Sequence, residues 1–554
     1  MPQSDSGADL VLTGGSVCTM APNRAMAKGV AVAKGRIVAV GSERDVEDLV
    51  GARTRRIDLH GRTVLPGFQD AHVHPVIAGL NLSRCPLHEL PRTADTYLEA
   101  IGRYAAANPE QPWILGDGWY MSAFPGGTPM RSDLDRVVAD RPAFFVNRDG
   151  HGAWVNGRAL ELAGISGDTP DPVSGRIERD PGGQPSGTLH EGAMELIRAL
   201  IPLPTVEDVV HGLELAQAYL HRLGITAWQD AWVTPPDLDA YRLLAERGRL
   251  TGRAIACQWW DRDRGVEQVE EMIERRRTGT LGRLRATTVK IMQDGVAENY
   301  TAAMLEPYLD EHGQATTNRG ISFVEPELLE RHVTRLDAEG FQIHVHALGD
   351  RAVREALDAL AAARRANGPS DGRHHLAHLQ VVDRSDIPRF RELGVTANIQ
   401  PYWACRDDQM VQLTLPYLPS DRALLQYPFR SLQRAGARLA GGSDWSVSTP
   451  NVLAELEVAV TRISPEDRSA AAFLPEEALD LSAALAAFTS GSAYVNHLDA
   501  ETGSVEVGKL ADLVVVDRNL FATNAGPLGD ARILLTLVEG EVVHEAATLE
   551  AVPH

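Results

Sequence analysis

His72 and His74 are two residues apart, follow the apolar run 63–68 and could bind a metal ion. Alternate side chains of a β-strand lie on the same face, so both imidazoles can reach one point at the end of such a strand. Imidazole is neutral over much of the physiological pH range and is a common metal ligand. An isolated pair also arises by chance, so its significance depends on the rest of the chain.

Other ionisable side chains lie in, or directly after, further apolar runs. They are Lys290, His344, His346, His378 and Asp444. So many at the ends of one set of strands are better explained by a shared site than by coincidence. Cysteine does not contribute, because the cysteines are few, widely scattered and without zinc-type spacing. Any metal must therefore be held by His, Asp or Glu.

Lys290 is unusual because it lies within the apolar run 286–292. A buried ammonium group loses its hydration and needs a compensating interaction. One explanation is a lysine of lowered pKa that reacts with carbon dioxide, since the resulting carbamate can bridge two cations through its two oxygens. The other is an ordinary buried ion pair, for instance with Asp294. The residues alone leave both explanations open.

Eight strand-like runs alternate with amphipathic helical segments, the pattern of a parallel sheet with crossover helices. Eight such units predict an α/β fold, a (β/α)8 TIM barrel, whose active site lies at the C-terminal ends of the strands. The candidate residues would then project from one end of the barrel. The expected strands cover residues 63–68, 226–229, 253–258, 286–292, 342–346, 375–379, 395–399 and 438–441.

Two flanks and one long insertion depart from this alternation. Short alternating segments broken by turn residues predict β structure at 1–62 and again at 495–554, and both ends are expected to form one composite β-sandwich. Residues 63–75 and 205–494 would form the metal-binding barrel. Residues 76–204, rich in Gly, Pro, Trp and Asp, are interpreted as an α/β insertion between barrel strands 1 and 2 that covers the barrel mouth.

The composition is that of a globular protein, and its charge favours a small molecule as the partner. With 554 residues and 44% hydrophobic content, the chain can bury a large core in more than one domain. Its net charge of -21 repels polyanions and argues against nucleic acid or an anionic membrane as a partner. The sequence has no long apolar run and no secretory signal, so we expect a cytoplasmic protein. The oligomeric state stays open, with a homodimer as one candidate.

The motifs around these residues resemble those of the metal-dependent amidohydrolase superfamily. Within it, they are most similar to the branch of YtcJ-like hydrolases that includes the N-substituted formamide deformylases. The chain departs from the branch pattern at His190, Gly152 and Ser446, of which the first two lie in the insertion and bear on the substrate more than on the chemistry. The similar segments span nearly the whole chain and are 65–74, 149–156, 185–191, 289–295, 346–352, 442–445 and 508–512, together with His378.

The resemblance implies a barrel, a composite β-sandwich and a zinc site that holds two ions. His344 lies on the same strand face as His346, but the family pattern has the ligand directly before Ala-x-Gly-Asp, so we assign His346. His344 is expected to pack or hydrogen-bond behind the ligands. The residues that match the family's ligands are His72, His74, the bridging carboxylated Lys290, His346, His378 and Asp444.

The resemblance also implies a mechanism. Two divalent ions bridged by the carbamate and a hydroxide would activate water and polarise the scissile carbonyl. Asp444 would take the proton of the attacking water and pass it to the leaving nitrogen. His151, in the insertion, is the candidate for binding the substrate carbonyl or its oxyanion, with a loop histidine of no role as the alternative. Asp294 and Asp350 would orient ligands.

Three classes of function compete. The leading one is a hydrolase that cleaves a C–N bond of a small-molecule amide, either an N-substituted formamide or an N-acyl amide. The second is a hydrolase of cyclic amides, carbamates or ureas, or a deaminase of the same superfamily. Deaminases generally use one metal and lack a lysine at the position of Lys290, which weighs against them. The third, a non-catalytic metal-binding protein, predicts a missing ligand, and none is missing.

Overall fold

The computed structural model describes residues 7–547 except 24, 88–89, 149–151 and 173–174. The chain divides into two compact units. The barrel unit consists of Met1–Pro75 and Gln217–His554, and the inserted unit of Val76–Ala216. No helix among the described residues has both the length and the apolar content needed to span a bilayer.

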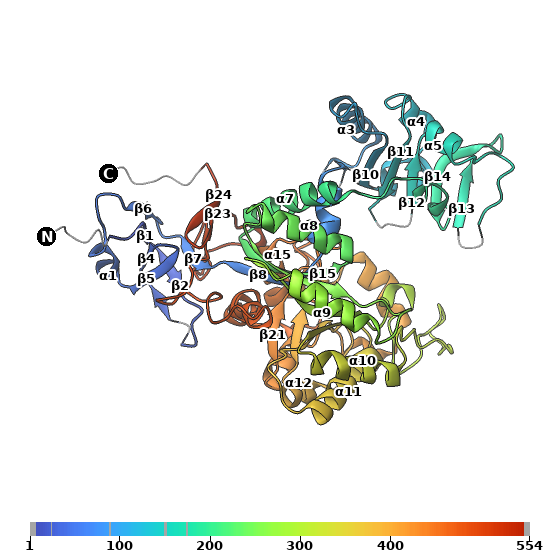
Figure 1. The fold of residues 1–554 in the computed structure, drawn as a ribbon. Coiled ribbons are helices and arrows are strands. Elements are labelled where there is room, and N and C mark those ends of the chain that lie inside the picture. The colour runs from blue at the N-terminus through green and yellow to red at the C-terminus, as the bar shows by residue number, and fades with distance from the viewer. Residues whose placement is uncertain (1–6, 24, 88–89, 149–151, 173–174, 548–554) are drawn as a thin grey trace. The chain divides into compact units, whose positions relative to one another are not determined.

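A sheet of eight parallel strands forms the centre of the barrel unit. Helices connect successive strands on the outside, among them α8 (Pro235–Glu246), α9 (Gln268–Thr278), α10 (Pro326–Ala338) and α12 (Ile387–Leu393), as Figure 1 shows. In spatial order the strands are β8 (Phe68–Val73), β15 (Ile225–Val233), β16 (Arg253–Trp259), β17 (Leu284–Met292), β18 (Gln342–Ala347), β19 (His375–His378), β20 (Thr396–Ile399) and β21 (Arg438–Gly441).

Backbone hydrogen bonds join the two ends of this sheet. The N–H of Asp444, just after β21, donates to the carbonyl of His72 over 2.7 Å. The N–H of His74 donates to the carbonyl of Trp445 over 2.6 Å. The predicted (β/α)8 barrel is therefore confirmed, and its closure brings the first and last strands together at their C-terminal ends.

The first barrel strand lies further along the chain than residues 63–68, where the sequence pattern placed it. Residues Thr63–Pro66 form β7, which belongs to another sheet. There β7 pairs antiparallel with β22 (Leu513–Val516) and parallel with β2 (Ser16–Cys18). Both β7 and β8 are buried, but β8 contains the polar residues Gln69, Asp70 and His72, so the apolar pattern favoured β7, which the single residue Gly67 separates from β8.

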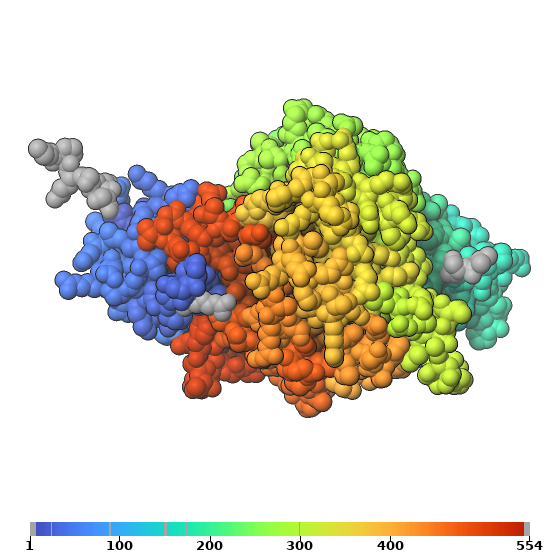
Figure 2. Space-filling model, turned by 90° about the horizontal axis from the view of Figure 1, so that it is seen from below, coloured from blue at the N-terminus to red at the C-terminus, as the bar shows by residue number. Residues whose placement is uncertain are grey.

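The two flanks of the chain combine in two β-sheets. Their buried side chains form one cluster that includes Leu12 and Val30 from the N-terminal flank and Val515 and Leu535 from the C-terminal flank. Figure 2 shows the C-terminal segment, in red, against the N-terminal segment, in blue. The sheets have the orders β5-β4-β1-β6 and β24-β23-β22-β7-β2-β3, with β1 (Leu10–Thr13), β3 (Met26–Ala27), β4 (Gly29–Ala33), β5 (Arg36–Gly41), β6 (Arg55–Asp58), β23 (Ile533–Val538) and β24 (Glu541–Glu545).

The inserted unit is an α/β structure with its own core. Buried aromatic residues such as Trp119, Phe145 and Trp154 pack beneath its helix α3 (Ala94–Ala107). That this unit covers the barrel mouth stays a prediction. Its sheet has the order β13-β14-β12-β11-β10-β9, with β9 (Cys85–Pro86), β10 (Ile114–Trp119), β11 (Ala143–Asn147), β12 (Gly152–Val155), β13 (Gly175–Arg179) and β14 (Pro185–Glu191).

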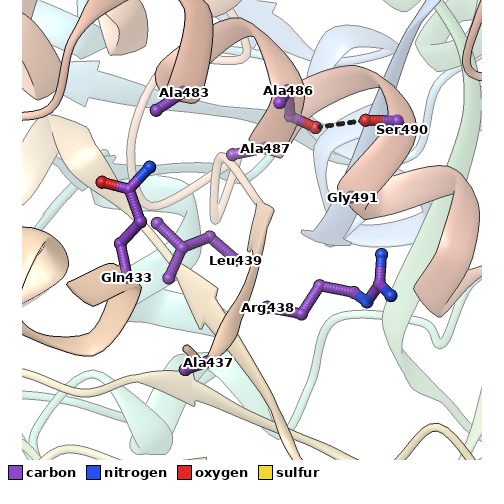
Figure 3. A pocket seen from close by; sticks show the side chains of 9 residues that line it. All are labelled: Gln433, Ala437, Arg438, Leu439, Ala483, Ala486, Ala487, Ser490 and Gly491. Atoms are coloured by element: carbon purple, nitrogen blue, oxygen red, sulfur yellow. Dashed lines mark hydrogen bonds between the residues drawn. The ribbon is translucent and has the colours of Figure 1, made fainter. Parts of the chain in front are cut away.

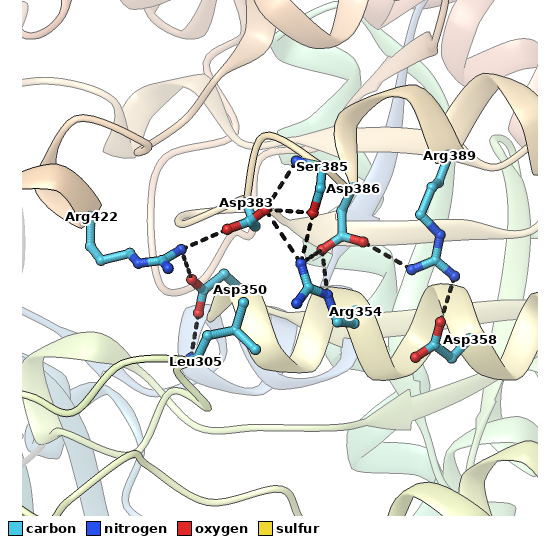
Figure 4. A network of polar contacts seen from close by, with 9 residues as sticks. All are labelled: Leu305, Asp350, Arg354, Asp358, Asp383, Ser385, Asp386, Arg389 and Arg422. Carbon is cyan, nitrogen blue, oxygen red and sulfur yellow. Dashed lines mark hydrogen bonds and ion pairs between the residues drawn. The ribbon is translucent and has the colours of Figure 1, made fainter.

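A network of ion pairs joins segments on the outside of the barrel (Figure 4). Arg422 Nη1 lies 2.6 Å from Asp350 Oδ2 and 2.9 Å from Asp383 Oδ2. Asp350 begins α11 (Asp350–Asn367), and its Oδ1 accepts a hydrogen bond from the N–H of Leu305 over 2.7 Å. We call the network the polar clamp, and its members are Asp350, Arg354, Asp358, Asp383, Ser385, Asp386, Arg389 and Arg422.

Candidate metal centre

Three of the predicted ligands meet where β8 and β21 end. His72 and His74 extend from the end of β8, and Asp444 follows β21. Asp444 Oδ1 lies 3.4 Å from His72 Nε2 and 3.1 Å from His74 Nε2. One ligand atom from each residue lies within 4.8 Å of the others, a separation that lets the three hold one metal ion.

His346 and His378 extend this cluster across the barrel. The ring centroid of His378 lies 4.7 Å from that of His72 and 4.5 Å from that of His346. Asp294 Oδ1 lies 3.1 Å from His346 Nδ1, which leaves His346 Nε2 available as a ligand. The structure therefore brings all four predicted histidine ligands into one row, with His74 at one end, 5.3 Å from His72 between ring centroids.

Backbone geometry fixes the position of Asp444. Its φ is 57°, in the left-handed region that few side chains other than Asn, Asp and Gly adopt readily. Asp70 Oδ1 accepts hydrogen bonds from the backbone N–H of His72 and of Ser443, both over 3.0 Å, and so ties β8 to the turn that carries Asp444. Burial alone would raise the pKa of Asp444, but hydrogen bonds from His72 and His74 hold it well below its usual range. Asp444 is thus an ionised carboxylate.

Lys290, on β17, is only 3% exposed. Burial lowers its pKa to about 8, against the opposing influence of Asp444. In the part of the chain that the structure describes, Lys290 has no carboxylate within ion-pair distance. Asp294, the alternative partner, instead receives hydrogen bonds from His346 and from the backbone N–H of Leu348. An ion pair between Lys290 and Asp294 is therefore not found.

The donor set fits a divalent metal ion. Imidazole nitrogens and carboxylate oxygens are ligands for zinc and for similar divalent ions. His378 Nε2 is buried and has no hydrogen-bond partner among the described residues. Burial of an unpaired polar atom costs free energy, and a metal ion next to His378 would satisfy this nitrogen.

Other residues from the sequence analysis have mixed outcomes. His344 Nε2 lies 2.9 Å from His72 Nδ1, a hydrogen bond behind a ligand as expected. Asp350 was expected to orient a ligand, and this is wrong: its carboxylate is held by Arg422 and Leu305 in the polar clamp. His151 lies outside the described residues.

Three buried ionisable residues near the ligands were not singled out as site residues from the sequence. They are Asp70, His375 and Glu455. Asp70 and His72 are two residues apart on one strand and therefore share a face, a spacing that could have identified Asp70 as a site residue. The ring centroid of His375 lies 4.0 Å from that of His344. His375 precedes His378 by three residues, a spacing that places side chains on opposite faces of a regular strand. Because the φ of His378 is 78°, this regular alternation does not hold at His378. Glu455 lies in the helix α15 (Val452–Thr461) that follows Asp444, where no strand spacing relates it to the ligands.

A cavity of about 230 Å³ lies beside the start of β21, away from the strand's C-terminal end (Figure 3). Small side chains of a helical segment line one side of it, together with Gln433, Arg438, Leu439 and Ser490. None of the predicted ligands contributes to its lining. The cavity is therefore not part of the candidate metal centre.

A parallel barrel with a cluster of histidines and an aspartate at its C-terminal strand ends is an architecture that serves metal-dependent hydrolases. Comparison with known families agrees with this class. The Amidohydrolase family matches residues 55–544. The chain belongs to this family.

Similar proteins cover nearly the whole chain. Protein LONG AFTER FAR-RED 3 of Arabidopsis thaliana is 30% identical, over 98% of this chain and 93% of its own length. YtcJ of Bacillus subtilis is 29% identical over 96% of this chain and 98% of its own. The N-substituted formamide deformylase of Arthrobacter pascens is 28% identical over 97% of this chain and 98% of its own. The resemblance derived from the motifs is confirmed.

Solved structures show the same architecture. An uncharacterized metal-dependent hydrolase from Pyrococcus furiosus superposes with a TM-score of 0.73 at 25% identity, covering 92% of this chain and 99% of its own. A corresponding protein from Pyrococcus horikoshii gives a TM-score of 0.72 at 24% identity. Family and fold together support hydrolase activity with a metal cofactor.

Proposed function

We propose that this protein is a zinc-dependent hydrolase that cleaves a C–N bond in a small-molecule amide, an N-substituted formamide or an N-acyl amide. The observation that carries the proposal is the meeting of His72, His74 and Asp444 at the C-terminal strand ends of an amidohydrolase-family barrel. The relative named as an N-substituted formamide deformylase supports this choice of substrate class.

The proposed centre takes two zinc ions. When bound, zinc lowers the pKa of a coordinated water molecule and polarises a carbonyl group. Lys290 can serve as a metal ligand after its neutral amine nitrogen has bonded to the carbon of carbon dioxide and released one proton. This reaction converts the buried neutral amine into an anion with two ligand oxygens. The proposed ligands are His72, His74, the carboxylated Lys290, His346, His378 and Asp444.

Asp444 is the proposed acid–base residue. Its ionised carboxylate can accept the proton of the attacking water and give it to the leaving nitrogen, so that the product departs as a neutral amine. Asp294 orients His346 by accepting a hydrogen bond from its Nδ1, the kind of contact that fixes the ring of a metal-binding histidine.

Hydrolysis assays with the zinc-loaded full-length protein test the proposal. The panel should contain N-substituted formamides, N-acyl amides, cyclic amides, ureas, carbamates and aminated heterocycles. We expect amine release from the first two classes, loss of turnover on chelation and recovery with zinc. Turnover restricted to cyclic substrates, or ammonia release from heterocycles, would replace the substrate assignment. Full turnover by protein without metal in elemental analysis would reject the mechanism.

A further inference from the structure

Two tryptophans stack at the C-terminal edge of the barrel. The rings of Trp232, on β15, and Trp259, on β16, lie 4.4 Å apart between centroids with an interplanar angle of 9°. Trp232 is 41% exposed, whereas every other residue of β15 is buried. The stack therefore leaves part of the Trp232 side chain uncovered. We call Trp232 and Trp259 the indole platform.

A β-bulge in β15 sets the direction of Trp232. Between Asp230 and Val233 this strand advances three residues while its neighbour β16 advances two. Asp230 faces the outer helices, because its Oδ2 accepts a hydrogen bond from the hydroxyl of Tyr241 in α8 over 2.9 Å. In a regular strand Trp232 would follow Asp230 onto that outer face.

Val233 takes the outer position instead. It pairs with Gln258, whose Nε2 donates to the carbonyl of Met272 in α9 over 3.1 Å and so faces outward. Paired residues of neighbouring strands share a face of the sheet, so Val233 also faces outward, where it is buried. Trp232, one residue earlier, is thereby turned to the inner face at the barrel mouth. Bulges beside active sites redirect a side chain in this way.

Trp259 faces the same space. Cys257, two residues earlier, points into the barrel, because its Sγ lies 3.7 Å from Nδ1 of His344 on β18, which is not a neighbouring strand. Alternate residues share a face, so Trp259, the last residue of β16, also points inward. Trp259 pairs with Lys290 on β17, and the N–H of Trp260 donates to the Lys290 carbonyl over 2.9 Å. The indole platform is thus one strand away from a proposed metal ligand.

We propose that the indole platform binds an aromatic ring of the substrate by stacking. Aromatic rings favour offset parallel contacts with one another, and two parallel indoles offer an outer face on which a third ring continues the stack. Apolar and aromatic side chains provide most of the contact area in small-molecule sites, while a few polar groups or a metal fix the orientation.

This inference rests on the proposed function and narrows its substrate class. A formyl group has a single carbon atom, so the ring must belong to the substituent on the amide nitrogen. The indole platform would hold that ring while the scissile carbonyl lies at the metal centre. Trp232 and Trp259 are then specificity-determining residues, and the preferred substrates are formamides whose nitrogen carries an aromatic group.

Two formamides that differ only in one ring test the indole platform. N-(2-phenylethyl)formamide carries an aromatic ring, and N-(2-cyclohexylethyl)formamide carries a saturated ring at the same distance from the nitrogen. The two rings also differ in hydrophobicity, so the informative quantity is how a substitution changes the ratio of kcat/KM, phenyl over cyclohexyl. The zinc-loaded full-length protein and its variants are compared.

Trp232→Leu keeps an apolar side chain but removes the indole. We expect the ratio to fall about 2- to 10-fold, the amount that one aromatic contact contributes beyond buried area. Trp232→Phe keeps an aromatic ring and should stay within about twofold of the parent ratio. Phe521→Leu, at a side chain of similar exposure (40%) that follows β22, is the matched control and should leave the ratio unchanged. Thermal melting of each variant reports its folding.

Binding of the same two formamides to metal-free protein separates the indole platform from the proposed chemistry. Ligand-observed NMR titration gives both dissociation constants, and their ratio should change in Trp232→Leu as the kinetic ratio does. Turnover with equal ratios in the parent protein and Trp232→Leu overturns the platform and leaves the proposed function standing. Turnover of neither formamide rejects the proposed function. The binding ratio then decides the platform, which is rejected if the ratio is unchanged or the parent protein binds neither compound.

Discussion

Asp444 combines two demands on one carboxylate, because it lies within reach of a metal ion and must also exchange a proton with the substrate. Asp444→Asn keeps the shape and one ligand oxygen but removes the base. We expect bound zinc with kcat lowered by about 10² to 10⁴, the usual range for general acid–base catalysis. Steady-state kinetics and elemental analysis of the same sample check this. Nearly normal turnover would remove Asp444 from the proposed role.

Lys290 distinguishes a two-metal centre from a one-metal centre. Lys290→Ala removes the carbamate and leaves space, so zinc content and activity should fall together and recover in part when a short carboxylic acid such as propionate is added. Lys290→Leu is the matched control, since its side chain occupies the space and should prevent rescue. Full zinc content and activity in Lys290→Ala would leave a mononuclear hydrolase as the remaining assignment.

At the residue scale, the sequence predicted those site residues that alternate along strands. His72 and His74 share a face by the two-residue period, and the structure places them beside Asp444. Residues related only through the closed barrel could not be predicted in this way. Glu455, for example, accepts a hydrogen bond from the backbone N–H of Tyr402 over 2.7 Å, and the two are far apart in the chain.

At the scale of elements, the polar clamp holds the start of α11 and the loop that contains Leu305. Partial burial by itself would raise the pKa of Asp383, but hydrogen bonds from Ser385 and Arg422 outweigh it and keep the pKa well below its usual range. Because the carboxyl is more acidic in the folded than in the unfolded chain, its stabilising contribution is complete above the unfolded pKa of about 4 and is lost as the pH falls below it.

Asp383→Asn should therefore lower the free energy of unfolding by about 1 to 3 kcal/mol at pH 7, the range for hydrogen bonds to charged groups. The difference from the parent protein should narrow as the pH falls below about 4. Urea unfolding at a series of pH values measures this. Asp358→Asn, at an exposed end of the clamp, is the control and should change stability by less than about 1 kcal/mol. A deficit in Asp383→Asn that is constant with pH would contradict the electrostatic explanation.

The sequence predicted which segments form strands better than it predicted which sheet each strand joins. The sequence pattern located eight barrel strands, of which seven agree with observed strands in the expected order, while the first shares only Phe68 with β8. The exception is β7, whose apolar residues Thr63–Pro66 suit a barrel strand equally well. Its partner β22 is far away in the sequence. The hydrophobic periodicity of a short segment does not predict a strand pairing over that distance.

At the scale of the whole molecule, ion pairs join the barrel to the sheet formed by the chain ends. Arg253, at the start of β16, pairs with Asp512 and lies 2.6 Å from Glu539 Oε1. The side chains of Arg253 and Asp512 are nearly inaccessible, at 6% and 2%. Arg283 also reaches Glu539, over 2.9 Å, from a more exposed position.

Arg253→Met should destabilise the protein by about 3 to 5 kcal/mol, because it leaves the buried Asp512 carboxylate without its partner. The double variant Arg253→Met, Asp512→Asn removes the unpaired charge and should regain part of this loss. Arg283→Met, with its partially exposed guanidinium, should cost about 1 kcal/mol or less. Denaturant unfolding gives all three values. A double variant no more stable than Arg253→Met would show that packing, not charge, dominates this junction.

The pairing of β7 with β22 has a consequence for biosynthesis. β22 is made roughly 450 residues after β7, an interval of roughly 20 to 90 s for a ribosome that adds about 5–20 residues per second. During that time the nascent chain lacks the strand that covers this edge of β7, and uncovered strand edges recruit other chains. We therefore expect chains that are stalled or truncated before β22 to expose an aggregation-prone edge of β7.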